Sequence, residues 1–234
     1  MDNSIELKSH TITDIMVKKA SRVKTKNAAP KRVAKKRSAA NASVPASAAQ
    51  RVKIMVGSSV YGFEDNLSAI VAQLTTLGYD VLNSHHGSIQ VNPHLSNLDN
   101  CLQAVKDCDL FLGIIRPYCG TGTIGDKNIT FEEIKEAIRL KKPYWFLVHR
   151  DVVFARTLFK KITLKSGDAI VLEKNRFFDM LSIEMYEYVI QNHVPVTLRN
   201  GNWAQEFYRL DDMMTYINTQ FSSREFIDNV LKKP

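Results

Sequence analysis

The stretch that decides the fold is VKIMVGSSVYGFEDNLSAIVAQLTTLGYDVLN, residues 52–83. Its first part, residues 52–59, is an aliphatic run that stops at a glycine and two serines, which is typical of a buried strand followed by a turn. Residues 64–80 then place apolar side chains at helical spacing and reach Gly78, a common signal for the end of a helix. Residues 80–83 form a second short apolar segment. The stretch therefore predicts a strand, a helix and a second, parallel strand.

Helix and strand continue to alternate as far as residue 150. Helical spacing over 97–109 is followed by an apolar strand at 110–116, and helical spacing over 130–142 is followed by another strand at 143–149. Alternation of this kind predicts a parallel sheet covered by helices on both faces. We therefore expect residues 51–150 to form an α/β domain with a flavodoxin-like, doubly wound sheet.

The pattern is less regular in the last third of the chain, residues 151–234. We expect a mainly helical extension there, packed on the α/β domain, with Trp203 in the core. The apolar residues of 194–199 predict a fifth strand. Helices are predicted over 151–163, 180–193, 210–221 and 224–233.

The basic character of the chain belongs to its first 50 residues. Residues 1–50 carry 11 basic and 3 acidic side chains, which accounts for the whole net charge of +8. Because 18–50 contains no aromatic and few large aliphatic residues, we expect disorder there, after one short amphipathic helix at 4–17. The basic block within 18–37 is suited to nucleic-acid backbones, and a solubilising tether is the alternative.

Composition also bears on location and on metals. No apolar run approaches the roughly 18–20 residues that span a bilayer, and Lys18 and Lys19 interrupt any signal-peptide core, so we expect a cytoplasmic protein without a membrane segment. Cys101 and Cys108 are spaced for burial on a helix and not for zinc, and no cofactor is expected. The adjacent histidines at 85 and 86 fit a surface loop better than a metal site.

Polar side chains follow several predicted strands, at the point where each strand ends. In an open parallel sheet, ligands bind beyond the carboxyl ends of the strands. We therefore expect a binding site there, although the serines after the first strand would alternatively cap the next helix. The candidate substrate-binding residues are Gly57, Ser58 and Ser59 after the first strand, Arg116 and Tyr118 after the third, and His149 after the fourth.

The helix predicted over 130–142 carries two adjacent glutamates near its start. Helical phase puts Ile134 on the face that packs on the sheet, Glu132 on the solvated face, and Glu133 at the boundary between the two. Glu133 is therefore a candidate for chemistry at the edge of the sheet. The competing interpretation is a capping box, T-x-x-E, formed by Thr130 and Glu133.

Residues 52–150 resemble a prokaryotic domain family of unknown function that is related to TIR domains and nucleoside 2-deoxyribosyltransferases. The segments that carry the resemblance are KIMVGSS (53–59), CLQAVKDCDLFLGIIRPYCG (101–120) and ITFEEIKEAIRLKKP (129–143). The Glu-x-x-x-Ala pattern of the family's functional helix falls on Glu133 and Ala137. In such relatives this glutamate attacks or stabilises the anomeric carbon while an N-glycosidic bond breaks, so the resemblance implies that Glu133 is catalytic.

The resemblance implies cleavage of NAD or of a nucleoside or nucleotide, with a role in bacterial antiphage defence and assembly into homo-oligomers or with a partner protein. The family's Arg-x-Tyr-Gly-like turn matches Arg116, Tyr118 and Gly120. Two other functions stay open at this point. One is a non-catalytic nucleotide-sensing or assembly module of the same fold, and the other is an adaptor that its basic tail recruits to nucleic acid.

Overall fold

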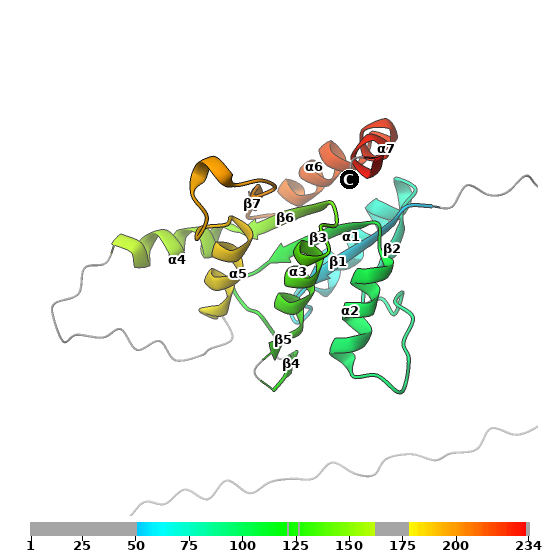
Figure 1. The fold of residues 1–234 in the computed structure, drawn as a ribbon, viewed down its shortest axis with the longest axis horizontal. Coiled ribbons are helices and arrows are strands. Elements are labelled where there is room, and N and C mark those ends of the chain that lie inside the picture. Colours follow the sequence, from blue (N-terminus) through cyan, green and yellow to red (C-terminus); the bar gives the residue numbers. More distant parts are fainter. Residues whose placement is uncertain (1–50, 121, 126, 162–177, 233–234) are drawn as a thin grey trace, which may run out of the picture. The chain divides into compact units, whose positions relative to one another are not determined.

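Five strands form one sheet in which every neighbouring pair is parallel (Figure 1). The strand order is β2-β1-β3-β6-β7, which is the flavodoxin-like order when the strands of this sheet are counted along the chain. The α/β, doubly wound fold class expected from the alternation is thereby confirmed. The strands are β1 (Lys53–Ser58), β2 (Asp80–Leu82), β3 (Leu110–Ile115), β6 (Tyr144–His149) and β7 (Ala204–Phe207).

This computed structural model describes residues 51–161, apart from 121 and 126, and residues 178–232. These residues belong to one compact unit, Ala48–Pro234. The expectations for the tail, including a helix at 4–17 and nucleic-acid contact through 18–37, lie outside the described residues.

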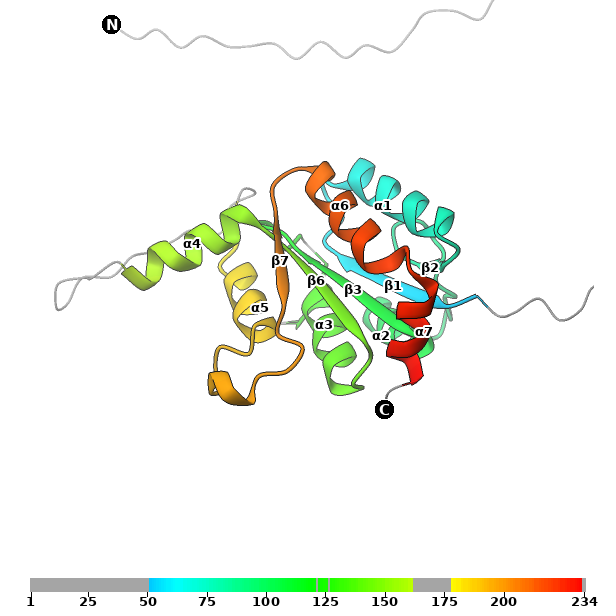
Figure 2. The ribbon, with the colours of Figure 1, turned by 90° about the horizontal axis from the view of Figure 1, so that it is seen from above.

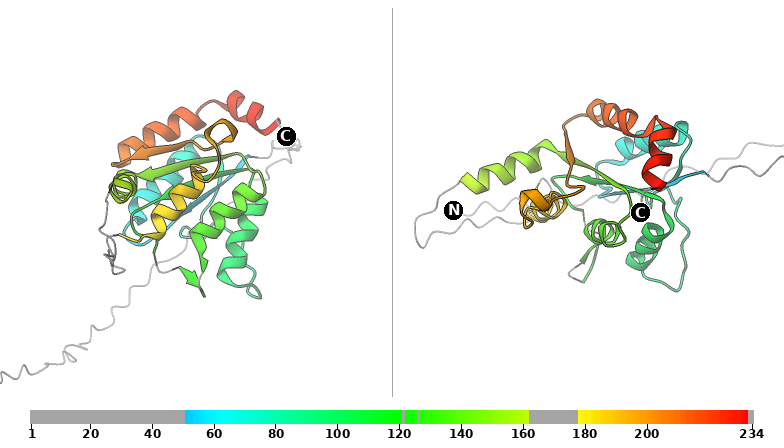
Figure 3. Two further views of the ribbon diagram at one scale, coloured as in Figure 1. Left: turned by 60° about the vertical axis from the view of Figure 1, so that its left-hand side comes forward. Right: turned by 45° about the horizontal axis from the view of Figure 1, so that its top comes forward.

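Helices cover both faces of the sheet (Figures 2 and 3). One face packs against α1 (Glu64–Thr76), α6 (Leu210–Phe221) and α7 (Arg224–Lys232). The other packs against α2 (Asn97–Asp107), α3 (Ile129–Arg139) and α5 (Leu181–Val189), with the start of α4 (Arg150–Lys161).

Strand β1 shows why the two cores form. Its side chains alternate between the faces, so Ile54 and Val56 join the core under α1, and Met55 joins the core under α2 and α3. Gly57 and Gly113 pair with each other in neighbouring strands. A Cβ atom at Gly113 would lie 2.7 Å from the ring of Phe146, so the large ring on β6 occupies the space that the glycine leaves.

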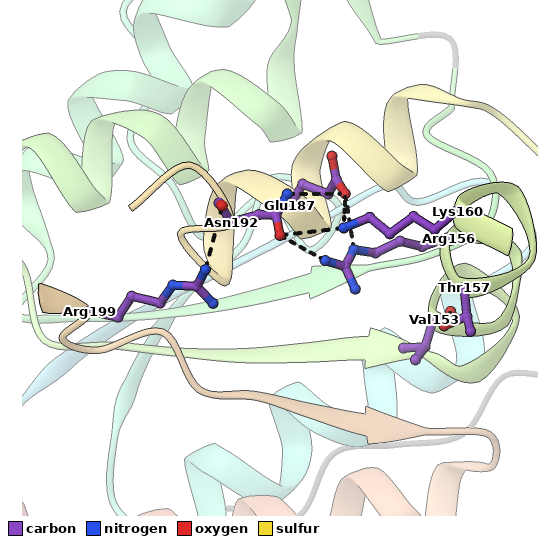
Figure 4. A network of polar contacts seen from close by, with 7 residues as sticks. All are labelled: Val153, Arg156, Thr157, Lys160, Glu187, Asn192 and Arg199. Atoms are coloured by element: carbon purple, nitrogen blue, oxygen red, sulfur yellow. Dashed lines mark hydrogen bonds and ion pairs between the residues drawn. The ribbon is translucent and has the colours of Figure 1, made fainter. Parts of the chain in front are cut away.

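Helix α4 runs outward from the end of β6 and is held to α5 by polar contacts (Figure 4). Arg156 Nε and Lys160 Nζ each lie 3.1 Å from Oε1 of Glu187. Arg156 also donates to Oδ1 of Asn192 at 3.0 Å. Because these groups are partly exposed, each ion pair contributes about 1 kcal/mol or less.

The fifth strand is not where the sequence predicted it. Residues Val196–Leu198 form a 3-10 helix after Pro195, and the strand that pairs with β6 is Ala204–Phe207. The reason is burial: Phe207 fills the core, whereas Val196 is 76 % exposed. The prediction of a core Trp203 is also wrong, since this side chain is 72 % exposed.

Candidate functional site

A cavity of about 590 Å³ lies beyond the carboxyl ends of β1 and β3. The strand order reverses between these two strands, and such a switch point is where open α/β sheets bind ligands. The volume falls within the range of about 300–1,000 Å³ that is typical of small-molecule sites. Its lining comes from the segments after β1, β2 and β3 and from the first turns of α2 and α3.

Glu133 forms part of the cavity wall and is only 3 % exposed. It is buried more completely than its position at the edge of the apolar face predicted. The Cys101 thiol donates a hydrogen bond to its carboxylate. Burial raises the pKa of Glu133 to about 7, and the hydrogen bond from Cys101 opposes this shift. A carboxyl group with such a pKa, in a cavity at the switch point, is a candidate for acid–base or nucleophilic chemistry.

The competing capping-box interpretation of Glu133 is wrong. Helix α3 begins at Ile129, and its N-cap is Asn128, whose Oδ1 accepts from the Phe131 amide at 3.1 Å. The Asn128 side chain also donates to the carbonyl of Cys119 at 3.1 Å. Thr130 therefore lies inside the helix, and Glu133 is not its capping partner.

The neighbouring Glu132 behaves as the helical phase predicted. Its carboxylate lies 2.8 Å from Nζ of Lys135, in an i,i+3 ion pair on the outer side of α3. Glu132 is not among the residues that line the cavity. The two adjacent glutamates thus differ in burial and in surroundings, and only Glu133 is placed to contact a ligand.

Ser58 and Ser59 line the same cavity and do not cap the first helix. Helix α1 begins at Glu64, and its N-cap is Phe63, which makes no side-chain capping bond. Ser59 Oγ donates to the carbonyl of Tyr118 at 2.7 Å, so its hydroxyl fastens β1 to the segment after β3. Ser58 Oγ donates to the adjacent carbonyl of Ser59, at 3.1 Å.

Arg116 holds the loop between β1 and α1. Its Nη1 donates to the carbonyls of Ser59 at 3.0 Å and of Tyr61 at 3.1 Å. Its guanidinium also lies 4.4 Å from the ring centroid of Phe63. Burial lowers the pKa of Arg116, but an arginine stays protonated in proteins at neutral pH. The loop residues that line the first cavity are therefore ordered by a fixed cation that does not line it.

Arg116 lines a second cavity of about 270 Å³, beyond the ends of β3, β6 and β7. Five of the six predicted substrate-binding residues are thus divided between two neighbouring cavities, and Gly57 lines neither of them. Ser58, Ser59 and Glu133 line the first, and Arg116, Tyr118 and His149 line the second. Its remaining lining residues are Phe63, Asn66, Pro117, Phe207, Tyr208 and Arg209.

Sequence reasoning missed Tyr208 and Arg209 because it placed the fifth strand too early. Once β7 is known to end at Phe207, these two residues are the first after a strand, which is the position that marked the other candidates. Arg150 stacks over the Tyr208 ring at 4.0 Å. The sequence therefore contains the same signal, polar residues directly after a strand. The end of this strand, however, is set by its pairing with β6.

His149 packs between aromatic rings at the edge of the second cavity. Its ring lies 5.2 Å from that of Phe207, and its Nδ1 accepts from the amide of Asp151 at 3.2 Å. Burial lowers the pKa of His149, and nearby charges partly oppose and partly reinforce this shift. The imidazole is therefore neutral at pH 7, and its Nε2 carries the proton.

The cysteines are buried thiols, as the helical spacing of Cys101 and Cys108 predicted; Cys119 is buried too. Burial raises the pKa of Cys101 to about 12 and that of Cys108 to about 11, so neither is a thiolate at neutral pH. Within the described ranges, no group of three or more His, Cys, Asp or Glu side chains is placed to hold a metal. Nor does that part of the chain contain a helix with the length and apolar character to cross a membrane.

Comparison with known proteins assigns the family. The chain matches none of the curated proteins. A family model described as a domain of unknown function, DUF4062, matches residues 53–169, which is half of the chain and includes both β1 and α3. The match therefore contains Glu133, whereas Tyr208 and Arg209 lie beyond it. On this match, the protein belongs to the DUF4062 family.

Proposed function

We propose that this protein cleaves the N-glycosidic bond of NAD or of a nucleoside or nucleotide, with Glu133 as the catalytic carboxylate. The observation that carries the proposal is the position of Glu133 in the wall of the 590 Å³ cavity at the switch point of the sheet. Its raised pKa, about 7, supports the assignment. A relation to TIR domains and nucleoside 2-deoxyribosyltransferases is part of the same proposal.

The chemistry suits a single buried carboxylate. As the bond between the anomeric carbon and the base breaks, its electron pair leaves with the base, and positive charge develops on the ribose. The ionised form of Glu133 stabilises that charge or forms an ester with the anomeric carbon. Water then attacks this carbon, which regenerates the carboxylate and releases a proton.

Three neighbouring residues would support the reaction in different ways. Gly57, on β1, leaves room for the carboxyl group of Glu133. Among the described residues, the Ser58 hydroxyl bonds only the adjacent Ser59 carbonyl, so it is suited to bind ribose hydroxyls. Ser59 orients the wall through its bond to Tyr118. The role in antiphage defence and the assembly into oligomers remain inferences from the resemblance, and the cytoplasmic location remains an inference from composition.

One observation favours a second candidate, a nucleotide-sensing module without catalysis. Glu133 is almost fully buried and is already hydrogen-bonded to Cys101. In such a module the carboxyl group would shape the cavity, and ligand binding would proceed without turnover. Recruitment to nucleic acid through residues 18–37 is a separate proposal, tested by comparing the salt dependence of binding with and without that segment.

The decisive experiment incubates the protein with NAD, nicotinamide riboside, adenosine and AMP, and measures the released base by chromatography. Glu133→Gln should reduce turnover at least about 100-fold, by analogy with the loss of other electrostatic catalytic groups. Glu132→Gln, its neighbour outside the cavity, should leave turnover unchanged. Equal turnover by wild type and Glu133→Gln would rule out the catalytic assignment, and binding without turnover would favour the sensing module.

A further inference from the structure

Opposite charges line the two neighbouring cavities. Among the described residues that line the first, the ionisable groups include two carboxyls, Glu64 and Glu133, and no lysine, arginine or histidine. Those that line the second include Arg116, Arg209 and His149, and no aspartate or glutamate. A phosphate group would be repelled in the first cavity and attracted in the second.

Two aromatic side chains in contact form the divider between the cavities. Tyr61 lines the first cavity and Tyr118 the second, and their rings are in edge contact with centroids 6.1 Å apart. Tyr61 is 60 % exposed. A ligand that enters both cavities would therefore cross the divider against these aromatic rings, which suits stacking with a sugar or base.

The second cavity places arginine side chains beside aromatic rings. Arg116 is fixed in place by the Ser59 and Tyr61 carbonyls, so little conformational entropy is lost when an anion binds. Arg209 is exposed at the start of α6, and Arg150 lies over the Tyr208 ring. Arg116 and Arg209 thus line a space together with Tyr118, Phe207 and Tyr208, and Arg150 contacts it only through the Tyr208 ring.

Two carboxylates lie near this cavity, and one of them is held by backbone amides. The Asp212 carboxylate accepts from the amides of Tyr208 and Arg209, both at 2.9 Å, and so fixes the turn between β7 and α6. The Asp151 carboxylate lies 3.5 Å from Nδ1 of His149 but forms no ion pair with it, because the imidazole is neutral and its Nδ1 accepts from the Asp151 amide. Neither lines the cavity, so the charges that a ligand meets there are those of the arginines.

The second cavity is less than half the volume of the first. Its 270 Å³ lies just below the range of about 300–1,000 Å³ for sites that enclose whole ligands. The first cavity is about twice as large and contains the candidate catalytic group. Both open at the same edge of the sheet, so a single elongated ligand suits the pair.

We propose that the second cavity binds the phosphate-bearing end of a nucleotide whose glycosidic bond lies beside Glu133 in the first. The chemical class of the ligand is therefore a nucleoside phosphate or dinucleotide, and not a free nucleoside. This inference rests on the proposed function for the glycosidic end, but the anion site itself is independent of turnover. Arg209 and Tyr208, both outside the family match, become ligand-binding residues.

The test is calorimetric binding of ADP and adenosine to the full chain. Arg209→Gln should weaken ADP binding about tenfold, the loss expected for a hydrogen bond between charged groups, and leave adenosine binding unchanged. Arg224→Gln, which removes an exposed arginine on α7, should change neither. Because Arg209 is exposed, its replacement should leave the folded structure intact, which circular dichroism checks.

Three results would overturn the proposal: no ADP binding by wild type, ADP binding by Arg209→Gln within twofold of wild type, or adenosine bound as tightly as ADP. Failure of this site and failure of the proposed function are distinguishable. Loss of turnover in Glu133→Gln together with unchanged ADP binding in Arg209→Gln would leave catalysis standing and remove the phosphate site. Weaker ADP binding in Arg209→Gln, with no turnover by wild type, would leave the phosphate site standing and remove the proposed catalysis.

Discussion

Glu133 and Gly57 face each other across the contact between α3 and β1, so closely that a Cβ atom on Gly57 would lie 3.0 Å from Oε2 of Glu133. The same atom would lie 2.9 Å from the Phe111 ring, so the added carbon would be crowded on two sides. The missing side chain at position 57 therefore makes room for the buried carboxyl group. The packing of β1 and the placement of the candidate catalytic carboxyl group therefore depend on the same contact.

Gly57→Ala should destabilise the protein by about 1–3 kcal/mol, the usual result of overpacking a well-filled interior. The substitution should also displace the Glu133 carboxyl group and lower any turnover. Urea unfolding measures the first effect, and Ser58→Ala, at the next position of the same strand, is the control. An unchanged unfolding midpoint in Gly57→Ala would contradict this account of the packing.

Stability should depend on pH through Glu133. Its pKa is about 7 in the folded protein and 4.5 ordinarily, so between these values the folded state binds more protons than the unfolded state. The free energy of unfolding should therefore fall by roughly 3 kcal/mol as pH rises through this window. Subtracting the profile of Glu133→Gln from that of wild type isolates this contribution. A difference that stays constant from pH 4.5 to 8 would show that Glu133 titrates normally.

The rate of any glycosidic cleavage should also follow the titration of Glu133, but it should rise with pH where the stability falls. Because the ionised carboxylate is the active form in the proposed reaction, kcat/KM should rise about tenfold per pH unit below pH 7 and level off above it. Initial rates from pH 5 to 9 provide the measurement. A rate that instead falls through pH 7 would assign Glu133 the role of a general acid.

Asn128→Ala should cost about 1–2 kcal/mol, because it removes both the N-cap of α3 and the bond to the Cys119 carbonyl. Thr130→Val keeps the side-chain volume within the first turn and should cost less. Thermal unfolding of the two variants compares them directly. A larger loss in Thr130→Val would restore Thr130 as the residue that starts the helix.

Arg116→Lys should loosen the loop between β1 and α1 although the charge is retained. An ammonium group does not reproduce the fork that donates to the Ser59 and Tyr61 carbonyls. We expect a loss of about 1–3 kcal/mol and faster amide hydrogen exchange over residues 59–63. Arg139→Lys, on the exposed side of α3, should show neither effect, and equal exchange in both variants would argue against a clamp.

The order of the sheet strands and helices from β1 to α4 follows from the sequence, because buried parallel strands are short apolar runs and the helices between them carry one apolar face. The short antiparallel pair of β4 (Thr123–Ile124) and β5 (Lys127–Asn128) was not predicted. The helical phase alone also separated Glu132 from Glu133. The fifth strand shows the limit of this reasoning. Residues 194–199 and 204–207 are both short segments with apolar side chains, and pairing with β6 selects the second.

The sequence by itself determined the α/β class, the position of Glu133 on α3 and the edge of the sheet at which polar residues gather, because each depends on local periodicity. The tertiary structure decided how deeply Glu133 is buried, which residue caps its helix and that the candidate binding residues line two cavities of opposite charge. These features depend on which side chains from distant segments meet. The distance between Gly57 and Glu133, or between Arg116 and the Tyr61 carbonyl, is set by packing across the sheet and is not encoded in either segment alone.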